Sequence, residues 1–290
     1  MKIIIIGKSG QLANELLANK PQGNEVLALG RNDVDITNLK ELDDVINNFK
    51  PSVIINSAAY TAVDKAESDI EAAYAINHIA VENIAKVAKK YSARFIHVST
   101  DFVFNGDNTT PYKVNDVTSP TSAYGASKRA GELAIIDNYP EHSSIIRTSW
   151  LYSTFGNNFV KTMLKLMEDK EELGIVNDQT GSPTSAKGLA KFIWALLKNP
   201  TTDLIYHWCD SGSTSWYGFA LAIQEEALKQ GLLTKKIPIK GIPTTSYPTP
   251  AKRPKYSVLD CSTSQQILTS EAWQDQLAQC LINLANNKKA

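Results

Sequence analysis

Short apolar runs alternate with longer amphipathic segments through the first half of the chain. Helical patterns over 11–20, 38–50, 66–91 and 122–138 separate these runs. Continuous Val/Ile/Leu runs between helices predict parallel strands whose sheet is covered on both faces, and right-handed crossovers make it doubly wound. The expected fold class is therefore α/β with a doubly wound parallel sheet. The runs that predict its strands are KIIIIG, EVLALG, SVIINSAA, RFIHVST and SSIIRTSW.

The pattern changes after about residue 150. Pro, Thr and Gly gather in NDQTGSPTSAKG and KGIPTTSYPTPAKRPKYS, while LGIVND and LIYHWCD resemble further strands. Such loop chemistry within ordered sequence predicts a second, smaller region that covers a substrate. We therefore expect a dinucleotide-binding domain over 1–150 and a mainly substrate-binding domain over 151–290, with a helix near 186–199 returning to the first domain.

Composition narrows the class of protein. The formal net charge of zero over 290 residues gives no field that attracts nucleic acid or an anionic membrane. No apolar run approaches the roughly 20 residues of a membrane span, and the start of the chain does not resemble a secretory signal. Cys209, Cys261 and Cys280 show no CxxC spacing, which predicts a reduced, cytoplasmic protein without structural zinc. His97 lies in a predicted strand and is interpreted as a packed core histidine.

The glycine turn after the first run allows two interpretations. A phosphate loop for ATP or GTP would need a glycine at position 2, where the chain has Lys2, so that interpretation fails. Gly7, Gly10 and Ala13 instead fit a strand, a tight turn and a helix whose N-terminus faces a pyrophosphate. The pattern is weak on its own, because a purely structural turn would also explain it.

The end of the second run is where such folds contact the adenine ribose of the cofactor. Arg31 there suits the 2′-phosphate of NADP(H), although a solvated turn would explain it equally well. Asp33 and Asp35 lie nearby and favour NAD(H) instead. We expect NADPH and leave NADH open.

The main chemical signal is Tyr124-Gly125-Ala126-Ser127-Lys128 at the start of a predicted helix. Spacing by four places Tyr124 and Lys128 on one face, where the lysine cation should lower the pKa of the tyrosine towards a useful range. Thr100 ends the fourth apolar run and supplies a hydroxyl at the same sheet edge. These three residues are the predicted catalytic group, protonating a carbonyl oxygen as a hydride reaches its carbon.

The chain resembles the extended short-chain dehydrogenase/reductase superfamily, whose cofactor fold is of the Rossmann type, and within it the dTDP-4-dehydrorhamnose reductases. Nearly the whole chain carries the resemblance, and the downstream motifs are the most specific to these reductases. The segments are GKSGQL, NSAAYTAVDKAE, STDFVFNG, SPTSAYGASKRAGE, RTSWLY, GNNFVKTML, NDQTGSPT and YPTPAKRP.

This resemblance implies reduction of the C4 ketone of dTDP-4-dehydro-L-rhamnose, the last step of dTDP-L-rhamnose synthesis. It implies that Tyr124 is the general acid and Lys128 its electrostatic partner and ribose anchor. With the turn and ribose residues above, the cofactor set is Gly7, Gly10, Gln11, Leu12, Arg31, Asp35, Ile36, Ala58, Ala59, Tyr60, Thr61, Tyr124 and Lys128. The implied substrate set is Thr100, Asp101, Trp150, Asn158 and Arg253.

Departures from related families set the remaining expectations. Sugar-nucleotide dehydratases carry Thr-Asp-Glu, and Phe102 cannot act as the base that their glutamate provides. Some relatives form a magnesium-linked dimer through carboxylates; Glu15 fits one ligand position, but Lys187 stands where an acid is expected. We therefore expect no magnesium, and leave a monomer or a different homodimer open. The alternatives are a reductase or epimerase of another nucleotide sugar, and a non-catalytic NADP-binding subunit like that of methionine adenosyltransferase.

Overall fold

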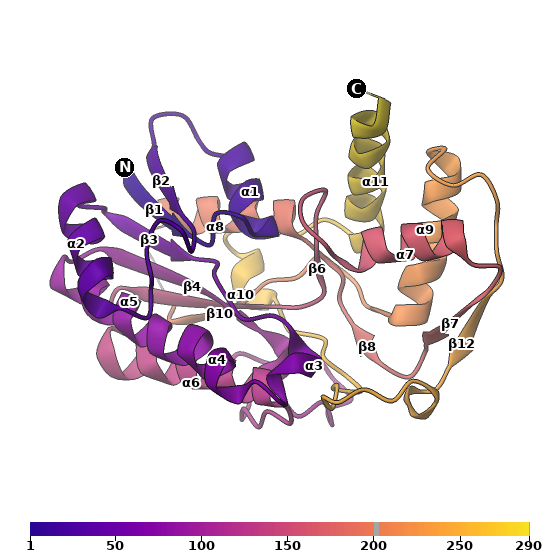
Figure 1. Cartoon of the computed structure of the whole chain (residues 1–290), viewed down its shortest axis with the longest axis horizontal. Coiled ribbons are helices and arrows are strands. Elements are labelled where there is room, and N and C mark those ends of the chain that lie inside the picture. Colours follow the sequence, from indigo (N-terminus) through magenta and orange to yellow (C-terminus); the bar gives the residue numbers. More distant parts are fainter. Residues whose placement is uncertain (200–202, 290) are drawn as a thin grey trace.

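The central sheet organises the first half of the chain. The computed structural model describes residues 1–199 and 203–289, and within them a parallel sheet has the strand order β10-β5-β4-β3-β1-β2 (Figure 1). The predicted doubly wound α/β class is confirmed. Its strands are β1 (Lys2–Ile6), β2 (Glu25–Leu29), β3 (Val53–Asn56), β4 (Arg94–Thr100), β5 (Ser143–Thr148) and β10 (Ile205–His207).

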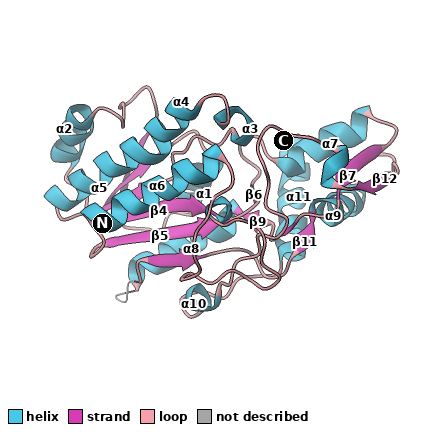
Figure 2. Ribbon diagram, turned by 90° about the horizontal axis from the view of Figure 1, so that it is seen from below, coloured by secondary structure: helices cyan, strands magenta, loops and turns pink. Residues whose placement is uncertain are grey.

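Helices cover both faces of this sheet because its strands are apolar on both sides. Ile4 and Ile6 of β1 pack beneath α2 (Leu39–Phe49), α5 (Ala80–Lys90) and α6 (Ala123–Asn138). Ile3 and Ile5 face the opposite way, against α1 (Gln11–Ala18) and α8 (Ala186–Lys198). In Figure 2, α5 and α6 lie above the sheet and α8 below it.

The predicted helix over 66–91 is divided. It consists of α3 (Val63–Ala66), α4 (Ile70–Tyr74), a π-helical turn η1 (Ala75–Ile79), and α5. Within η1, the amide of Asn77 accepts from the Tyr60 backbone N at 2.9 Å and donates to the Tyr60 backbone O at 3.1 Å. The widened turn therefore lets Asn77 hold the loop that follows β3, a frequent use of π-turns near functional sites.

The second half builds a separate layer from short strands and three long helices. Its pairs join β6 (Leu151–Tyr152) to β9 (Thr184–Ser185), β7 (Leu173–Val176) to β12 (Ile239–Ile242), and β8 (Thr180–Gly181) to β11 (Thr214–Ser215). The helices α7 (Phe159–Asp169), α9 (Trp216–Lys229) and α11 (Trp273–Lys289) pack around Phe219 and Leu281. Short helices η2 (Asp101–Val103), η3 (Thr244–Ser246) and α10 (Ser262–Gln265) complete the described elements.

Two segments of the second half return to the main sheet. The strand β10 pairs with β5, and the indole of Trp194 in α8 donates to the backbone O of Leu16 in α1 at 3.2 Å. The first half and the returning segments therefore share one core. No helix in the described residues has the length and apolar character needed to cross a membrane.

Candidate active site

A cleft of about 1220 Å³ is lined by residues at the carboxyl ends of the sheet strands and by residues of the second half of the chain. Its volume exceeds the ~300–1,000 Å³ of ordinary small-molecule sites, so it has room for a dinucleotide and a second ligand. Every site residue expected from the sequence lines it. These are Gly7, Gly10, Gln11, Leu12, Arg31, Asp35, Ile36, Ala58, Ala59, Tyr60, Thr61, Thr100, Asp101, Tyr124, Lys128, Trp150, Asn158 and Arg253.

The glycine turn forms a cradle at one end of the cleft. Gly7 has a φ of +97°, and a Cβ there would lie 2.8 Å from the backbone N of Ala58. Gly10 is the N-cap of α1, and no side chain caps that helix end. The first N–H groups of α1 therefore remain available to an anion, which is the arrangement that binds a pyrophosphate. The residues present fit a dinucleotide.

The end of β2 pairs one of the two acids that lie near Arg31 in the sequence. The carboxylate of Asp33 pairs with Lys8 Nζ at 2.7 Å and accepts from the backbone N of Gly30 at 2.8 Å. Bonding to Lys8 and Gly30 lowers the pKa of Asp33. Lys8 thus neutralises Asp33, while Arg31 and Asp35 line the cleft itself.

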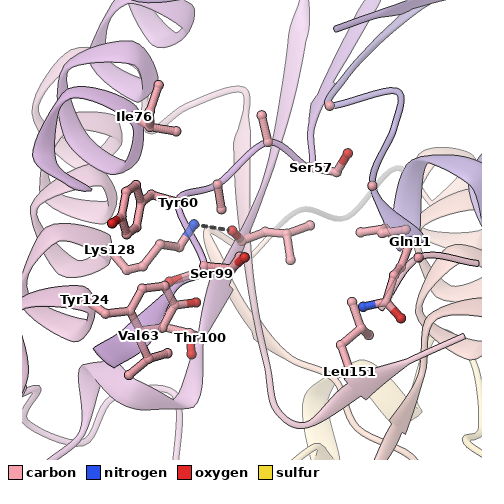
Figure 3. A pocket seen from close by; sticks show the side chains of 18 of the residues that line it. Gln11, Ser57, Tyr60, Val63, Ile76, Ser99, Thr100, Tyr124, Lys128 and Leu151 are labelled. Atoms are coloured by element: carbon pink, nitrogen blue, oxygen red, sulfur yellow. Dashed lines mark hydrogen bonds between the residues drawn. The ribbon is translucent and has the colours of Figure 1, made fainter. Parts of the chain in front are cut away.

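Thr100 and Tyr124 meet at the floor of the cleft (Figure 3). The Thr100 hydroxyl donates to Asp101 Oδ1 at 3.0 Å and accepts from the backbone N of Phe102 at 3.2 Å. Tyr124 lies in the first turn of α6, whose N-cap is Ser122. Burial raises the pKa of Tyr124 to about 12; Thr100 opposes that change and the charge of Asp101 adds to it. The expected lowering by Lys128 is therefore wrong for this geometry.

Lys128 extends from α6 to the back of the cleft. Its Nζ donates to the backbone O of Val98 at 2.7 Å and lies 3.3 Å from Nε2 of His97 (Figure 3 draws the first contact). Burial lowers the pKa of Lys128 to about 8, although the charge of Glu132 acts in the opposite direction. The sequence suggested neither contact, because it shows spacing along one helix but not what the opposing strand presents.

A buried ion pair fixes α6 on the sheet. Glu132 accepts from Arg147 Nε and Nη2, both at 2.8 Å, and from the Ser99 hydroxyl at 2.6 Å. Burial favours the protonated carboxyl, yet Arg147 and Ser99 hold the pKa of Glu132 below its usual value. Because α6 carries Tyr124 and Lys128, this ion pair sets their position relative to β4.

An aromatic stack forms the opposite wall. Trp150 has a φ of 45°, and its ring lies 3.5 Å from the ring of Trp216, with 10° between the planes. A Cβ on Gly181 would lie 2.6 Å from Trp150 Cε2, so the glycine of the TGSPT segment makes room for the indole. Trp216 also lines the cleft, and sequence analysis missed it because a tryptophan in an apolar segment usually packs in a core.

Polar contacts cross from one wall to the other. Arg253 pairs with Asp64 through two hydrogen bonds, at 3.0 and 2.8 Å, and the backbone N of Ala251 also donates to Asp64. Asn158 donates to the side-chain oxygen of Gln11 at 2.8 Å. Both contacts join the second half of the chain to the cofactor side, so the cleft is closed at two points.

Glu15 and Lys187 line a separate, small pocket beside α1. The Glu15 carboxylate accepts from the Ser153 hydroxyl at 2.6 Å and from the Asn19 amide at 3.2 Å. Among the residues that the structure describes, no group of three or more His, Cys, Asp or Glu side chains could hold a metal ion.

Comparison with known proteins shows relatives that match most of the chain. The family described as RmlD substrate binding domain matches residues 1–286. A protein of Escherichia coli K12 named dTDP-4-dehydrorhamnose reductase is 42% identical over 285 residues, covering 94% of this chain and 95% of its own length.

Solved structures give the same result. A dTDP-4-dehydrorhamnose reductase of Clostridium acetobutylicum has a TM-score of 0.91 at 38% identity, covering 98% of this chain and 99% of its own. The enzyme of the same name from Bacillus anthracis, in complex with NADP, has a TM-score of 0.92 at 35% identity, covering 97% and 99%. The similarity therefore includes both walls of the cleft.

Proposed function

The chain belongs to the RmlD family of dTDP-4-dehydrorhamnose reductases, and from this premise we propose that it reduces the C4 ketone of dTDP-4-dehydro-L-rhamnose to dTDP-L-rhamnose. The observation that carries the proposal is the placement of Thr100, Tyr124 and Lys128 on the floor of one cleft, between a dinucleotide cradle and an aromatic wall. Phe102 packs edge-on against Tyr124, at 5.5 Å between ring centroids, where a dehydratase would need a basic glutamate. Simple carbonyl reduction is the chemistry that these groups support.

NADPH, with NADH as an alternative, supplies the hydride when bound. The cradle of Gly7, Gly10 and the start of α1 would hold its pyrophosphate. Arg31 would pair with a 2′-phosphate, which favours NADPH because Lys8 already neutralises Asp33.

Tyr124 acts as the general acid. The raised pKa of Tyr124, about 12, keeps its proton in place at neutral pH until negative charge develops on the ketone oxygen. Transfer of that proton to the oxygen, with hydride addition at the carbon, converts the C=O group to CH–OH. Lys128, whose Nζ lies at the back of the cleft, would anchor the cofactor ribose, and the Thr100–Asp101 pair would orient the ketone oxygen.

The second half of the chain would hold the sugar nucleotide. Trp150 would present an apolar face to the sugar, and Asn158 lines the same cleft. Arg253 pairs with Asp64 and would offer its remaining N–H groups to a pyrophosphate. Residues 1–150 with α8 would form the cofactor domain, and 151–290 mainly the substrate domain. We also infer a cytoplasmic monomer or homodimer that needs no nucleic-acid or membrane partner.

The test is to mix the purified protein with NADPH and dTDP-4-dehydrorhamnose, and to follow both NADPH absorbance and the sugar product. The proposal predicts stoichiometric oxidation and formation of dTDP-L-rhamnose. Turnover with UDP-linked keto sugars alone would instead identify a reductase of another nucleotide sugar. Tight NADPH binding without oxidation would favour the non-catalytic alternative.

A further inference from the structure

A line of buried polar side chains runs behind the cleft floor. Asn56 ends β3, His97 lies in β4, and Lys128 projects from α6; all three are buried. Asn56 Nδ2 lies 3.1 Å from His97 Nδ1, and His97 Nε2 lies 3.3 Å from Lys128 Nζ. The histidine interpreted from the sequence as core packing therefore connects two functional elements.

The backbone fixes the direction of this line. The N–H of Ala58 donates to Asn56 Oδ1 at 3.0 Å, so the amide must present its NH₂ group to His97. Nδ1 of His97 is therefore the acceptor. Burial, and after it a positive charge on Lys128, lower the pKa of His97 well below its usual value, so the ring is neutral and carries a single proton. That proton is on Nε2.

The Nε2–H group consequently points at Lys128. An ammonium group has only donors and would meet this N–H as a second donor, whereas a neutral amine offers a lone pair. The other near partner of Nζ is the Val98 carbonyl at 2.7 Å, which accepts from either form. Burial of Lys128 also favours the neutral amine, because it lowers the pKa of Lys128.

We propose that Ala58, Asn56 and His97 form a one-way hydrogen-bond chain that disfavours the ammonium form of Lys128, and that His97 is a positioning residue for the reduction. The inference deepens the proposed function and rests on it for the catalytic role of Lys128. Because Ala58 belongs to the cofactor-facing turn, movement of its peptide would free the Asn56 amide to turn over. Each hydrogen bond from Asn56 to Lys128 would then reverse its direction, and Nζ would take up a proton.

Other ionisable groups near Lys128 do not explain this effect. Glu132, one turn further along α6, favours the cation but is paired with Arg147 and Arg129. Tyr124 and Tyr60 lie beside Lys128 (Figure 3), and both phenols are neutral because burial raises their pKa. The Tyr60 hydroxyl donates to Asp69. Asp101 interacts with Tyr124. His97 is thus the ring that presents an N–H to Nζ.

The direct test is ¹⁵N NMR of the histidine rings in the labelled, unmodified protein without added cofactor. The proposal predicts that His97 is protonated at Nε2 and bare at Nδ1 near neutral pH. A proton on Nδ1 would overturn it. Because this measurement needs no substrate, it can succeed or fail independently of the NADPH oxidation assay.

Asn56→Asp is the variant that reverses the direction of these hydrogen bonds. A carboxylate accepts from both the Ala58 N–H and His97 Nδ1–H, which leaves the Nε2 lone pair facing Lys128. We expect the titration of Lys128 Nζ, followed by NMR, and the basic limb of the kcat profile to move up by about one pH unit or more. The control is Ser144→Ala, an equally buried change on β5, the strand beside β4, at a residue that takes no part in these hydrogen bonds. It should change neither the Lys128 titration nor the kcat profile.

His97→Phe provides a second variant if Asn56→Asp does not fold. It keeps a ring in place but removes the N–H that faces Nζ, so the Lys128 titration should move up by a smaller amount. An unchanged or lowered Lys128 titration in a folded variant of either kind would refute the proposal.

Discussion

The two walls of the cleft are held by different interactions. The cofactor wall, which includes the cleft floor with Thr100, Tyr124 and Lys128, is fixed by parallel strand ends and by the buried pair of Glu132 and Arg147. The sugar wall is an aromatic stack of Trp150 on Trp216, closed by exposed or half-buried polar contacts such as Arg253 to Asp64. Proton transfer needs atoms held in one geometry, whereas a flat sugar surface tolerates small displacements. We therefore expect changes in the first wall to affect chemistry and stability, and changes in the second to affect KM.

The largest expected effect comes from removing the acid on the cofactor wall. Tyr124→Phe should lower kcat by about 10²–10⁴-fold, the usual contribution of a general acid. Stopped-flow NADPH oxidation would give kcat, and fluorescence titration should show unchanged NADPH affinity. A loss of affinity equal to the loss of rate would mean that Tyr124 holds the cofactor instead.

Glu132→Gln tests how that wall is held. It leaves Arg147 buried without its charge partner, which should lower the free energy of unfolding by about 3–5 kcal/mol. Urea denaturation measures the change. The matched control is Glu172→Gln in the second half, whose pair with Lys240 is exposed and should contribute less than about 1 kcal/mol. Equal losses would contradict the contrast between the walls.

Asp101 gives a pH-dependent effect at the boundary of the two walls. Burial raises the pKa of Asp101 to about 6 from an ordinary value of 3.8. Between these values the folded protein keeps a proton that the unfolded chain releases, so its contribution to stability falls as pH rises through this window. The free energy of unfolding of Asp101→Asn, relative to that of the unmodified protein, should therefore rise by about 2 kcal/mol between pH 4 and pH 7. A constant difference across that range would rule out this titration.

Trp216→Ala should act on the sugar wall alone. Loss of the stacked ring should raise KM for the sugar nucleotide about tenfold, leave the NADPH affinity unchanged and lower kcat little. Trp216→Phe, which keeps an aromatic face, should recover most of the loss. A matching fall in NADPH affinity would show that the two walls are not independent.

The smallest expected effect concerns the contact between the walls. Asp64→Asn keeps the side-chain shape but removes the charge that holds Arg253, so KM for the sugar nucleotide should change by a few-fold. Steady-state kinetics would measure it, and the salt dependence of KM should weaken in the variant. An unchanged KM at low and high salt would assign the pair a structural role.

The same contrast explains what the sequence could predict. Apolar runs, the glycine turn and the Tyr124–Lys128 spacing are local patterns, and they predicted the sheet, the glycine cradle and the catalytic residues. The family resemblance, and no local pattern, supplied most of the other residues that line the cleft. Trp216 and Asp64 could not be found in this way, because their partners are distant in sequence. The π-turn at η1 was also missed, since the reason for it is a contact of Asn77 with another loop.

The pKa of Tyr124 shows the limit of reasoning from spacing. A spacing of four residues along a helix brings two side chains to one face. Burial and the partners of each side chain then decide whether that side chain is charged. Lys128 turns towards Val98 and His97, and the phenol is left buried beside Thr100 and the charge of Asp101. Its pKa therefore rises, whereas the spacing alone predicts a fall.

The close stacking of Trp150 on Trp216 also has an optical consequence. Two parallel indoles 3.5 Å apart couple their excited states, which alters both near-ultraviolet circular dichroism and fluorescence yield. Any ligand that parts or tilts the rings would change that signal without a label. The sugar wall thus carries its own spectroscopic reporter, and occupancy of that side of the cleft can be followed while no reaction is taking place.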